Sequence, residues 1–429
     1  MNSRRKFLRN TALSSLAVLP FNTENKLSFG DNSFESFQKQ KNFLSEAEYW
    51  KAVRMQFPLK QGQAYFNNAT LGPLPDYTMS RMIEDMRENA IHAAETDYVS
   101  EGPQLLTGYF KYESLRTKIG NLIHADFDEI AITQNATFGM NYVANGLDLK
   151  KGDELLNTDQ EHGGGYAAWK LLAKRRGCIY KQAKMPVPAN DPDEIVQSIF
   201  KEVTKHTKVI AIPHIVSVYG VVLPVKEICA EARKRGIFTV VDGAQALGQI
   251  DVDVRDIGCD AYYGSLHKWF LAPAGSGILY IKKERMPEIW TTIGSYNWEN
   301  EEDHGFRLMQ TGTGNTAILA GIEASFNFYN TIIGPDKWLN RIKFLGDYLR
   351  SGLKSISKVT IYSSTHPDMC AGVTTYGVKG IAGSDLQKTF WERERLQPRS
   401  EGGELIRHSL HIYNSEDEID RTFKLLRSL

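Results

Sequence analysis

Two polar clusters that follow apolar runs contain residues able to carry out covalent chemistry. Asp242 opens an Asp-x-x-Gln sequence directly after the β-rich run 238–241, and Ser265-x-His-Lys follows the run 261–263. A lysine amine such as that of Lys268 can attack a carbonyl carbon, and once released it can carry a proton. Taken singly, Asp242 has the pattern of a helix cap and Lys268 that of a surface lysine.

Two further clusters follow other apolar runs. Residues 135–139 begin with Asn135 after the run 130–133, and their small side chains leave backbone N–H groups at the start of a helix free to hold a phosphate. Glu161, His162 and three glycines follow the run 154–156. Open parallel sheets bind ligands beyond the carboxyl ends of their strands, so we expect all four clusters to meet at one edge.

The order and spacing of Asp242, Gln245 and Lys268 resemble the pyridoxal-phosphate site of the class V aminotransferase family. The resemblance extends to residues 65–69, 311–313 and 406–414, and it covers roughly residues 60–428. It implies an α/β protein of fold type I. Such a protein has a large domain with a mainly parallel seven-stranded sheet between helices, and a smaller C-terminal α+β domain.

The resemblance also implies roles for individual residues toward pyridoxal 5'-phosphate. Lys268 would bind the cofactor covalently and move the α-proton of the substrate, Asp242 would face the pyridine nitrogen, and His162 would stack on the ring. Gln245 would hydrogen-bond the phenolic oxygen. The residues implied to hold the phosphate are Ala136, Thr137, Ser265 and His267, with Thr313 reaching the phosphate of a partner subunit.

The substrate implied by the resemblance is an amino acid or a molecule derived from one. Arg407 would hold its α-carboxylate as a bidentate pair, and Asn68 is the second predicted substrate-binding residue. The active site would lie between the two subunits of a homodimer.

Departures from the family pattern narrow the predicted reaction. Cysteine desulfurases of the family carry a nucleophilic cysteine shortly before the carboxylate-binding arginine, whereas residues 393–405 contain none. The chain is most similar to the isopenicillin N epimerase-like branch, with epimerisation, transamination, elimination and decarboxylation all open. Glycines 163–165 replace the usual His-x-x-Asn pattern, which either widens the substrate side or makes a tight turn.

Four alternatives compete with this interpretation. Residues 312–317 satisfy the G-x-G-x-x-G/A fingerprint of an NAD-dependent oxidoreductase. Residues 162–165 resemble an oxyanion loop, although no G-x-S-x-G elbow accompanies it. His408 and His411 have a spacing open to a metal site, but no carboxylate or cysteine is adjacent, and we predict no metal. A non-catalytic binding protein on the same fold is the fourth.

The chain must place these residues with alternating strands and helices. Apolar β-rich runs at 130–133, 154–156, 209–212, 238–241, 261–263 and 277–281 alternate with helical patterns at 166–174, 193–203 and 225–235, which is typical of a sheet buried on both faces. After residue 333 the order changes to a long helix, two strands, a helix, and a final strand and helix. We therefore predict an N-terminal segment and large domain over 45–330 and a small domain over 331–429.

The amino terminus has the features of an export signal. Residues 3–9, with Arg4 and Arg5, resemble the twin-arginine translocation signal, and a short apolar stretch at 11–21 follows it. That stretch is too short to span a bilayer. We therefore predict a signal region over 1–30, a polar linker over 31–44, and a periplasmic bacterial protein carried by the twin-arginine machinery.

Composition excludes other classes of protein. Lys+Arg and Asp+Glu are both 51, so the basic surplus needed for nucleic acid is missing. The four cysteines have no C-x-x-C pairing, which argues against a zinc ribbon or a disulfide framework.

Overall fold

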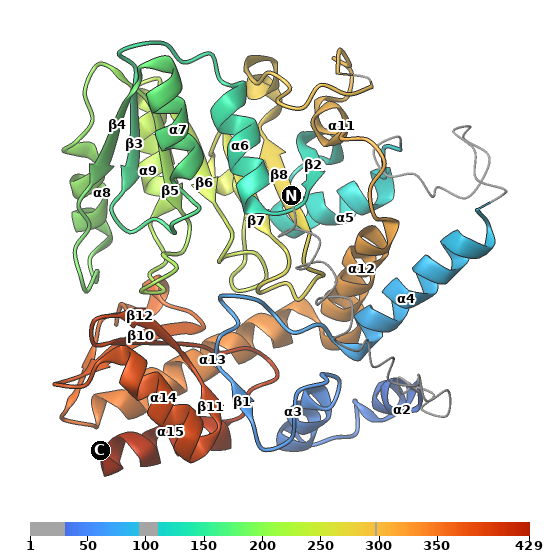
Figure 1. Ribbon diagram of the computed structural model, residues 1–429, viewed down its shortest axis with the longest axis vertical. Coiled ribbons are helices and arrows are strands. Elements are labelled where there is room, and N and C mark those ends of the chain that lie inside the picture. The colour runs from blue at the N-terminus through green and yellow to red at the C-terminus, as the bar shows by residue number, and fades with distance from the viewer. Residues whose placement is uncertain (1–30, 94–109, 297) are drawn as a thin grey trace, which may run out of the picture.

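The computed structural model describes residues 31–93, 110–296 and 298–429 (Figure 1). The predicted signal region lies outside these residues. No helix within the described ranges combines the length and apolar character needed to cross a membrane.

A mainly parallel sheet forms the centre of the large domain and confirms the predicted fold class. Its strands lie in the order β2-β8-β7-β6-β5-β3-β4, and β8 is antiparallel to both of its neighbours. The strands of this sheet are β2 (Ile130–Thr133), β3 (Glu154–Thr158), β4 (Ile179–Ala183), β5 (Thr207–Pro213), β6 (Phe238–Asp242), β7 (Ala261–Ser265) and β8 (Gly277–Ile281).

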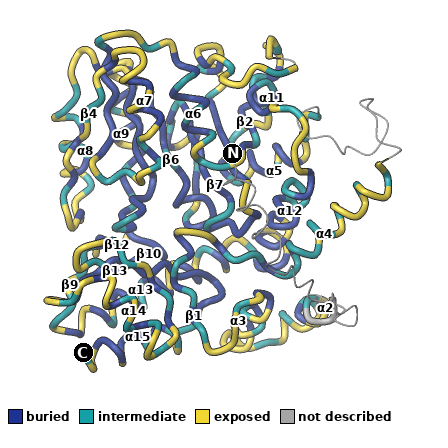
Figure 2. Tube along the Cα trace, in the orientation of Figure 1, coloured by how far each residue is buried: buried dark blue, intermediate teal, exposed yellow. Residues whose placement is uncertain are grey.

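Both faces of this sheet are buried, which explains its near-continuous apolar strands. Along β5, Val209 and Ala211 belong to the apolar core on one face, and Ile210 and Ile212 to the core on the other. The first core includes side chains of α6 (Ala136–Gly146), α7 (Ala167–Arg176) and α11 (His304–Met309). The second includes side chains of α5 (Glu113–Ile123), α8 (Pro192–Phe200) and α9 (Val225–Lys234). Figure 2 shows the buried strands between more exposed helices.

The small domain is an antiparallel sheet with helices packed on it. Its strands lie in the order β12 (Arg399–Gly402), β13 (Leu405–Ser409), β10 (Val373–Val378) and β9 (Val359–Ile361). The helices are α13 (Pro335–Lys354), α14 (Gly383–Glu394) and α15 (Glu416–Ser428). Leu345, Leu349 and Leu353 recur every fourth residue on α13 and enter the core of this domain.

The N-terminal segment packs against the small domain, which the sequence did not predict. Strand β1 (Ala64–Tyr65) pairs in parallel with β11 (Leu396–Gln397), and Ala64 and Phe66 lie in the small-domain core. Helix α3 (Glu46–Arg54) is capped by Ser45, which forms a capping box with Glu48. Helix α4 (Asp76–Ile91) then packs on α12 (Thr316–Asn327).

The prediction of a polar linker over 31–44 is wrong for most of that range. Residues Asp31–Gln40 form helix α2, and Phe37 is buried. Phe34 stacks on Tyr77 with ring centroids 4.6 Å apart. Two apolar residues on one face of an otherwise polar helix are too few for a periodic sequence signal, so only the packing reveals the helix.

Short helices connect the remaining elements: α10 (Val254–Ile257), η1 (Phe127–Glu129), η2 (Lys283–Glu288), η3 (Phe328–Ile333) and η4 (Pro367–Met369). Strands β3, β6 and β7 are parallel within the sheet. Strand β2 runs in the same direction, because β8 between β2 and β7 is antiparallel to both. Their carboxyl ends therefore meet at one edge of the sheet, as expected from the four polar clusters.

Candidate active site

A cavity of about 500 Å³ lies at this edge of the sheet. The ends of the parallel strands form one side of it, and Arg399, Glu401 and Arg407 of the small-domain sheet form another. The predicted residues that line it are Ala136, Thr137, His162, Asp242, Gln245, Ser265, His267, Lys268 and Arg407.

Lys268 lies in the turn after β7, and the surrounding backbone holds it in place. The Asn68 Nδ2 donates to the Lys268 carbonyl at 3.3 Å, and the Gly72 N–H donates to the His267 carbonyl at 2.9 Å. A Cβ on Gly72 would lie 2.2 Å from the Lys268 carbonyl oxygen, so this close approach requires glycine. Burial lowers the pKa of the Lys268 amine to about 8, although nearby Asp242 acts in the opposite direction.

Asp242 ends β6 and acts both as a turn residue and as a cavity residue. Its Oδ1 accepts a hydrogen bond from the Ala244 N–H at 2.8 Å. Its Oδ2 lies 3.4 Å from the position that a Cβ on Gly165 would take, so the missing side chain at 165 leaves this oxygen uncovered. Burial raises the pKa of Asp242, while the Ala244 hydrogen bond and Lys268 lower it.

His162 is held in a tight turn by the glycines that follow it. The Gly165 N–H donates to the His162 carbonyl at 2.6 Å, and the Gly164 N–H donates to His162 Nδ1 at 3.1 Å. Since Nδ1 accepts this bond, the neutral ring carries its proton on Nε2. Burial and the nearby Lys268 lower the His162 pKa, which favours that neutral form.

The start of α6 borders the cavity and is the candidate place for a phosphate. Asn135 caps the helix by accepting from the Phe138 N–H at 3.2 Å, and the Ala136 N–H donates to Ser265 Oγ at 3.0 Å. Thr137 lines the cavity beside them. His267 Nδ1 is buried and has no hydrogen-bond partner among the described residues. A buried ring nitrogen without a partner, in the same cavity as a helix N-terminus, fits a bound phosphate.

Gln245 is oriented by two hydrogen bonds. Its Oε1 accepts from Trp269 Nε1 at 2.7 Å, and its Nε2 donates to the Ala69 carbonyl at 2.9 Å. One amide hydrogen therefore remains for a ligand. An amine, a carboxylate, an amide and a helix N-terminus gathered in one cavity fit pyridoxal phosphate.

Arg407 is buried at the opposite wall. Its Nη1 donates to the Ser217 carbonyl at 2.8 Å, and its Nη2 donates to Asn67 Oδ1 at 3.1 Å. Glu401 Oε1 lies 2.9 Å from Nη1. Burial lowers the pKa of Arg407 to about 10, and Glu401 acts against this shift. The guanidinium thus stays charged at neutral pH.

Two predicted site residues do not line this cavity. Asn68 is fully buried behind it, and its Oδ1 accepts a hydrogen bond from the Tyr413 hydroxyl at 3.1 Å. The preceding residue, Asn67, contacts Arg407 instead. Thr313 is exposed on the loop before α12, away from the cavity lining.

The sequence analysis placed Glu161 in a cluster at this edge without giving it a role, and it did not identify Glu401 as a cavity residue. Glu161 Oε1 accepts from the backbone N–H and the hydroxyl of Thr158, at 3.1 and 3.0 Å. Burial, reinforced by Asp242, raises the pKa of Glu161 to about 8. Its position directly before His162 was the available signal. The sequence signal for Glu401 was weaker: it lies two residues after Arg399, so on a regular strand the two side chains would share a face.

The alternatives drawn from the sequence find little support in the geometry. The 312–317 fingerprint follows α11 rather than a strand, so it lacks the strand-to-helix turn of a dinucleotide site. His408 packs between Phe66 and Tyr376, whereas His411 Nε2 lies 2.9 Å from the Trp269 carbonyl. The two rings therefore do not share a ligand position.

Known proteins resemble the chain over most of its length. The isopenicillin N epimerase of Streptomyces clavuligerus is 30% identical over 398 residues, covering 89% of this chain and 98% of the relative. A cysteine desulfurase of Serratia proteamaculans (strain 568) is 28% identical over 409 residues, covering 86% and 95%.

Solved structures agree with these sequence matches. The cystine C–S lyase C-DES, in complex with its reaction product cysteine persulfide, superposes with a TM-score of 0.75 and 26% identity over 87% of this chain and 100% of that one. A C-DES mutant with glycine covalently linked to the PLP cofactor gives 0.76 and 25%, over 88% and 99%. The family description Aminotransferase class-V matches residues 98–422. The chain is therefore a pyridoxal-phosphate-dependent enzyme and belongs to the class-V aminotransferase family.

Proposed function

We propose that this enzyme acts on an α-amino acid, holding the α-carboxylate on Arg407 and moving the α-proton with the amine of Lys268. The observation that carries this proposal is that a half-buried amine, Lys268, and a buried guanidinium, Arg407, line one cavity. An amine with a pKa of about 8 exchanges protons readily near neutral pH, whereas an ordinary lysine stays protonated.

Bound pyridoxal phosphate withdraws electrons from the bonds of the substrate α-carbon. Asp242 would support this by keeping the pyridine nitrogen protonated, and Gln245 would donate to the phenolic oxygen. Ala136, Thr137, Ser265 and His267 would hold the phosphate. His162, neutral and held by the glycine turn, would stack on the ring.

We further propose that the reaction does not use the cysteine route of the family's desulfurases. All four cysteines of the chain are buried, and none lines the cavity. Burial raises the pKa of Cys370, so its thiol stays protonated and is a poor nucleophile. The epimerase and the C–S lyase among the relatives leave epimerisation and elimination as the leading outcomes, and both begin with loss of the α-proton.

We also propose that the active enzyme is a homodimer and that the twin-arginine route exports it to the periplasm. Thr313 is exposed and is not part of the lining of its own cavity, which leaves it free to reach the phosphate of a partner subunit. Twin-arginine transport moves folded proteins, so it suits an enzyme that acquires its cofactor before export.

The test is exchange of the α-hydrogen in deuterated buffer, followed by proton NMR across a panel of amino acids. The purified holoenzyme should remove the α-proton signal of its substrates, and Lys268→Ala should remove this activity together with the visible band of lysine-bound cofactor. Lys234→Ala, at an exposed surface lysine, serves as the matched control. Exchange at the wild-type rate in Lys268→Ala would refute the assignment.

Arg407→Lys tests the carboxylate site separately. A single ammonium cannot reproduce the two parallel hydrogen bonds of a guanidinium, so KM should rise about tenfold or more with little change in the visible band. An unchanged KM would place the carboxylate elsewhere. Product identification with and without a 2-oxo acid acceptor then distinguishes transamination from the other outcomes.

A further inference from the structure

An acidic residue lies between two arginines on the small-domain wall of the cavity. The register of β12 and β13 places Arg399 directly opposite Arg407, and then shifts between Ser400 and Gly402. Glu401 is therefore the extra residue of a β-bulge. Bulges redirect side chains and are common beside active sites. Here the bulge turns Glu401 toward the arginine pair.

One carboxylate oxygen serves both cations. Glu401 Oε1 lies 2.9 Å from Arg407 Nη1 and 3.2 Å from Arg399 Nε. The Glu401 side chain is 11% exposed and that of Arg407 is 4%, whereas Arg399 is 44% exposed. Directly opposed like charges destabilise a strand pair. Glu401 offsets that repulsion at the buried end of the pair, beside Arg407, where water screens charges least.

This bridge leaves part of the Arg407 guanidinium unused. Its Nε is buried and has no hydrogen-bond partner in the described part of the chain. Thr70 and Asn67 accept from Nη2, so the guanidinium is held in position without being saturated. A ligand carboxylate can therefore bind at Nε while Glu401 stays in place, and its second parallel hydrogen bond would replace the 3.3 Å contact between Nη2 and Thr70.

The charges of this wall sum to a single positive unit. Two guanidinium groups and one carboxylate leave one positive charge, which one ligand carboxylate neutralises. A second ligand carboxylate would add an uncompensated negative charge in a partly buried place, which is costly. Without Glu401, the same wall would carry two positive charges and match a dicarboxylate.

We propose that Glu401 determines the substrate class of this enzyme by restricting the wall to one carboxylate, so that amino acids with a second carboxylate are rejected. The inference rests on the proposed α-carboxylate site at Arg407. It assigns Glu401 a role in specificity and none in the chemical step.

The test measures binding of propionate and succinate to the holoenzyme by titration calorimetry at constant pH and ionic strength. The two probes differ by one carboxylate, and neither has an amino group that could react. The wild-type enzyme should bind succinate no more tightly than propionate. In Glu401→Gln the ratio of succinate to propionate affinity should rise about tenfold. An unchanged ratio, with the visible cofactor band intact, overturns the proposal.

Glu404→Gln is the matched control, because it removes a charge from the same hairpin. Glu404 is exposed and accepts a hydrogen bond from the Gly380 N–H at 3.0 Å. Its substitution should leave the ratio at the wild-type value. If the affinity ratio rose as much in Glu404→Gln as in Glu401→Gln, the net charge of the protein would explain the effect, and the proposal would be overturned.

Arg399→Gln tests the same charge argument if Glu401→Gln does not fold. It lowers the charge of the wall to zero, so propionate affinity should fall about tenfold although Arg407 is untouched. Unaltered propionate binding would contradict the charge argument. The Arg399→Gln, Glu401→Gln double variant restores one positive charge and should return to the wild-type ratio.

Arg407→Lys separates this inference from the proposed function. Propionate binding that is insensitive to Arg407→Lys would refute the carboxylate site itself. Weakened propionate binding in Arg407→Lys, combined with an unchanged ratio in Glu401→Gln, would refute only the role of Glu401.

Discussion

At the scale of single residues, burial distinguishes Lys268 from a surface lysine. Desolvation disfavours the charged amine, and the cations Arg407 and Arg399 act in the same direction. The buried carboxylate of Asp242 opposes them without cancelling the effect. The result is an amine whose pKa is about 8, compared with 10.5 for an unperturbed lysine.

This shift predicts how the apoenzyme takes up its cofactor. Only the unprotonated amine attacks an aldehyde, so the rate at which added pyridoxal phosphate attaches should rise with pH and level off above about 8. Stopped-flow measurement of the visible band across pH checks this. Asp242→Asn removes the charge that raises the Lys268 pKa, so the inflection should move to lower pH. An inflection near 10.5 would show that the amine is not buried in solution.

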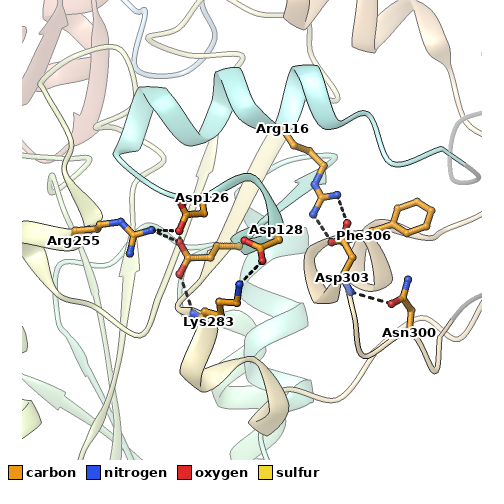
Figure 3. Close-up of polar contacts among 9 residues, drawn as sticks. Arg116, Asp126, Asp128, Arg255, Lys283, Asn300, Asp303 and Phe306 are labelled. Carbon is orange, nitrogen blue, oxygen red and sulfur yellow. Dashed lines mark hydrogen bonds and ion pairs between the residues drawn. The ribbon is translucent and has the colours of Figure 1, made fainter.

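At the scale of secondary-structure elements, a buried ion pair joins α5 to α11 (Figure 3). Arg116 Nη2 and Nη1 bind the two oxygens of Asp303 at 2.6 and 2.8 Å, and Arg116 Nε donates to the Ile130 carbonyl at 2.8 Å. Asp303 also caps α11 by accepting from the Phe306 N–H. This pair therefore anchors the helix that leads into the loop carrying Thr313.

Loss of this pair should be costly. Arg116→Ala leaves Asp303 charged and without its main partner in a buried place, so unfolding free energy should fall by about 3–5 kcal/mol. Urea denaturation of the apoprotein, read as a lower midpoint with an unchanged slope, measures the loss.

Lys283→Ala is the control for this measurement. Lys283 belongs to the neighbouring network in Figure 3, and its Nζ lies 2.7 Å from Asp128 on the surface. An exposed pair contributes about 0–1 kcal/mol. Equal losses of unfolding free energy in Arg116→Ala and Lys283→Ala would show that the buried Arg116–Asp303 pair contributes no more than an exposed pair.

At the scale of the whole molecule, the proposed dimer predicts complementation between two inactive variants. If each site combines Lys268 of one subunit with Thr313 of the other, a mixed dimer of Lys268→Ala and Thr313→Asp has both defects in one site and an intact second site. Random reassembly of equal amounts should recover about a quarter of wild-type activity. Size-exclusion chromatography establishes the oligomeric state. Activity that stays at the level of the separate variants would contradict a shared site.

Export is a second property of the whole chain. Replacing Arg4 and Arg5 together by lysine keeps the charge and removes the twin-arginine pattern. The double variant should accumulate in the cytoplasm with its cofactor bound, as judged by cell fractionation and the visible band. Periplasmic recovery equal to that of the wild type would rule out this route.

The sequence by itself determined most of the fold and the large-domain side of the site. Buried parallel strands are continuous apolar runs, and polar residues after them must lie at one edge whatever the rest of the chain does. That rule placed Asp242, Lys268, His162 and Thr137 around one cavity. The edge strand β4 was not predicted, because its residues are partly exposed and do not form a continuous apolar run.

Tertiary structure decided what depends on pairing between distant segments. Strand β1 has two residues and exists only through β11, so no local pattern could predict it. Asn68 was the predicted substrate-binding residue, whereas Asn67 reaches Arg407. Side chains alternate along extended backbone, so which of the two faces the cavity wall depended on how that segment packs beside β13. Glu401 points at the arginines because a register shift inserts it into a bulge. A register is a property of two strands, and a single stretch of sequence does not contain it.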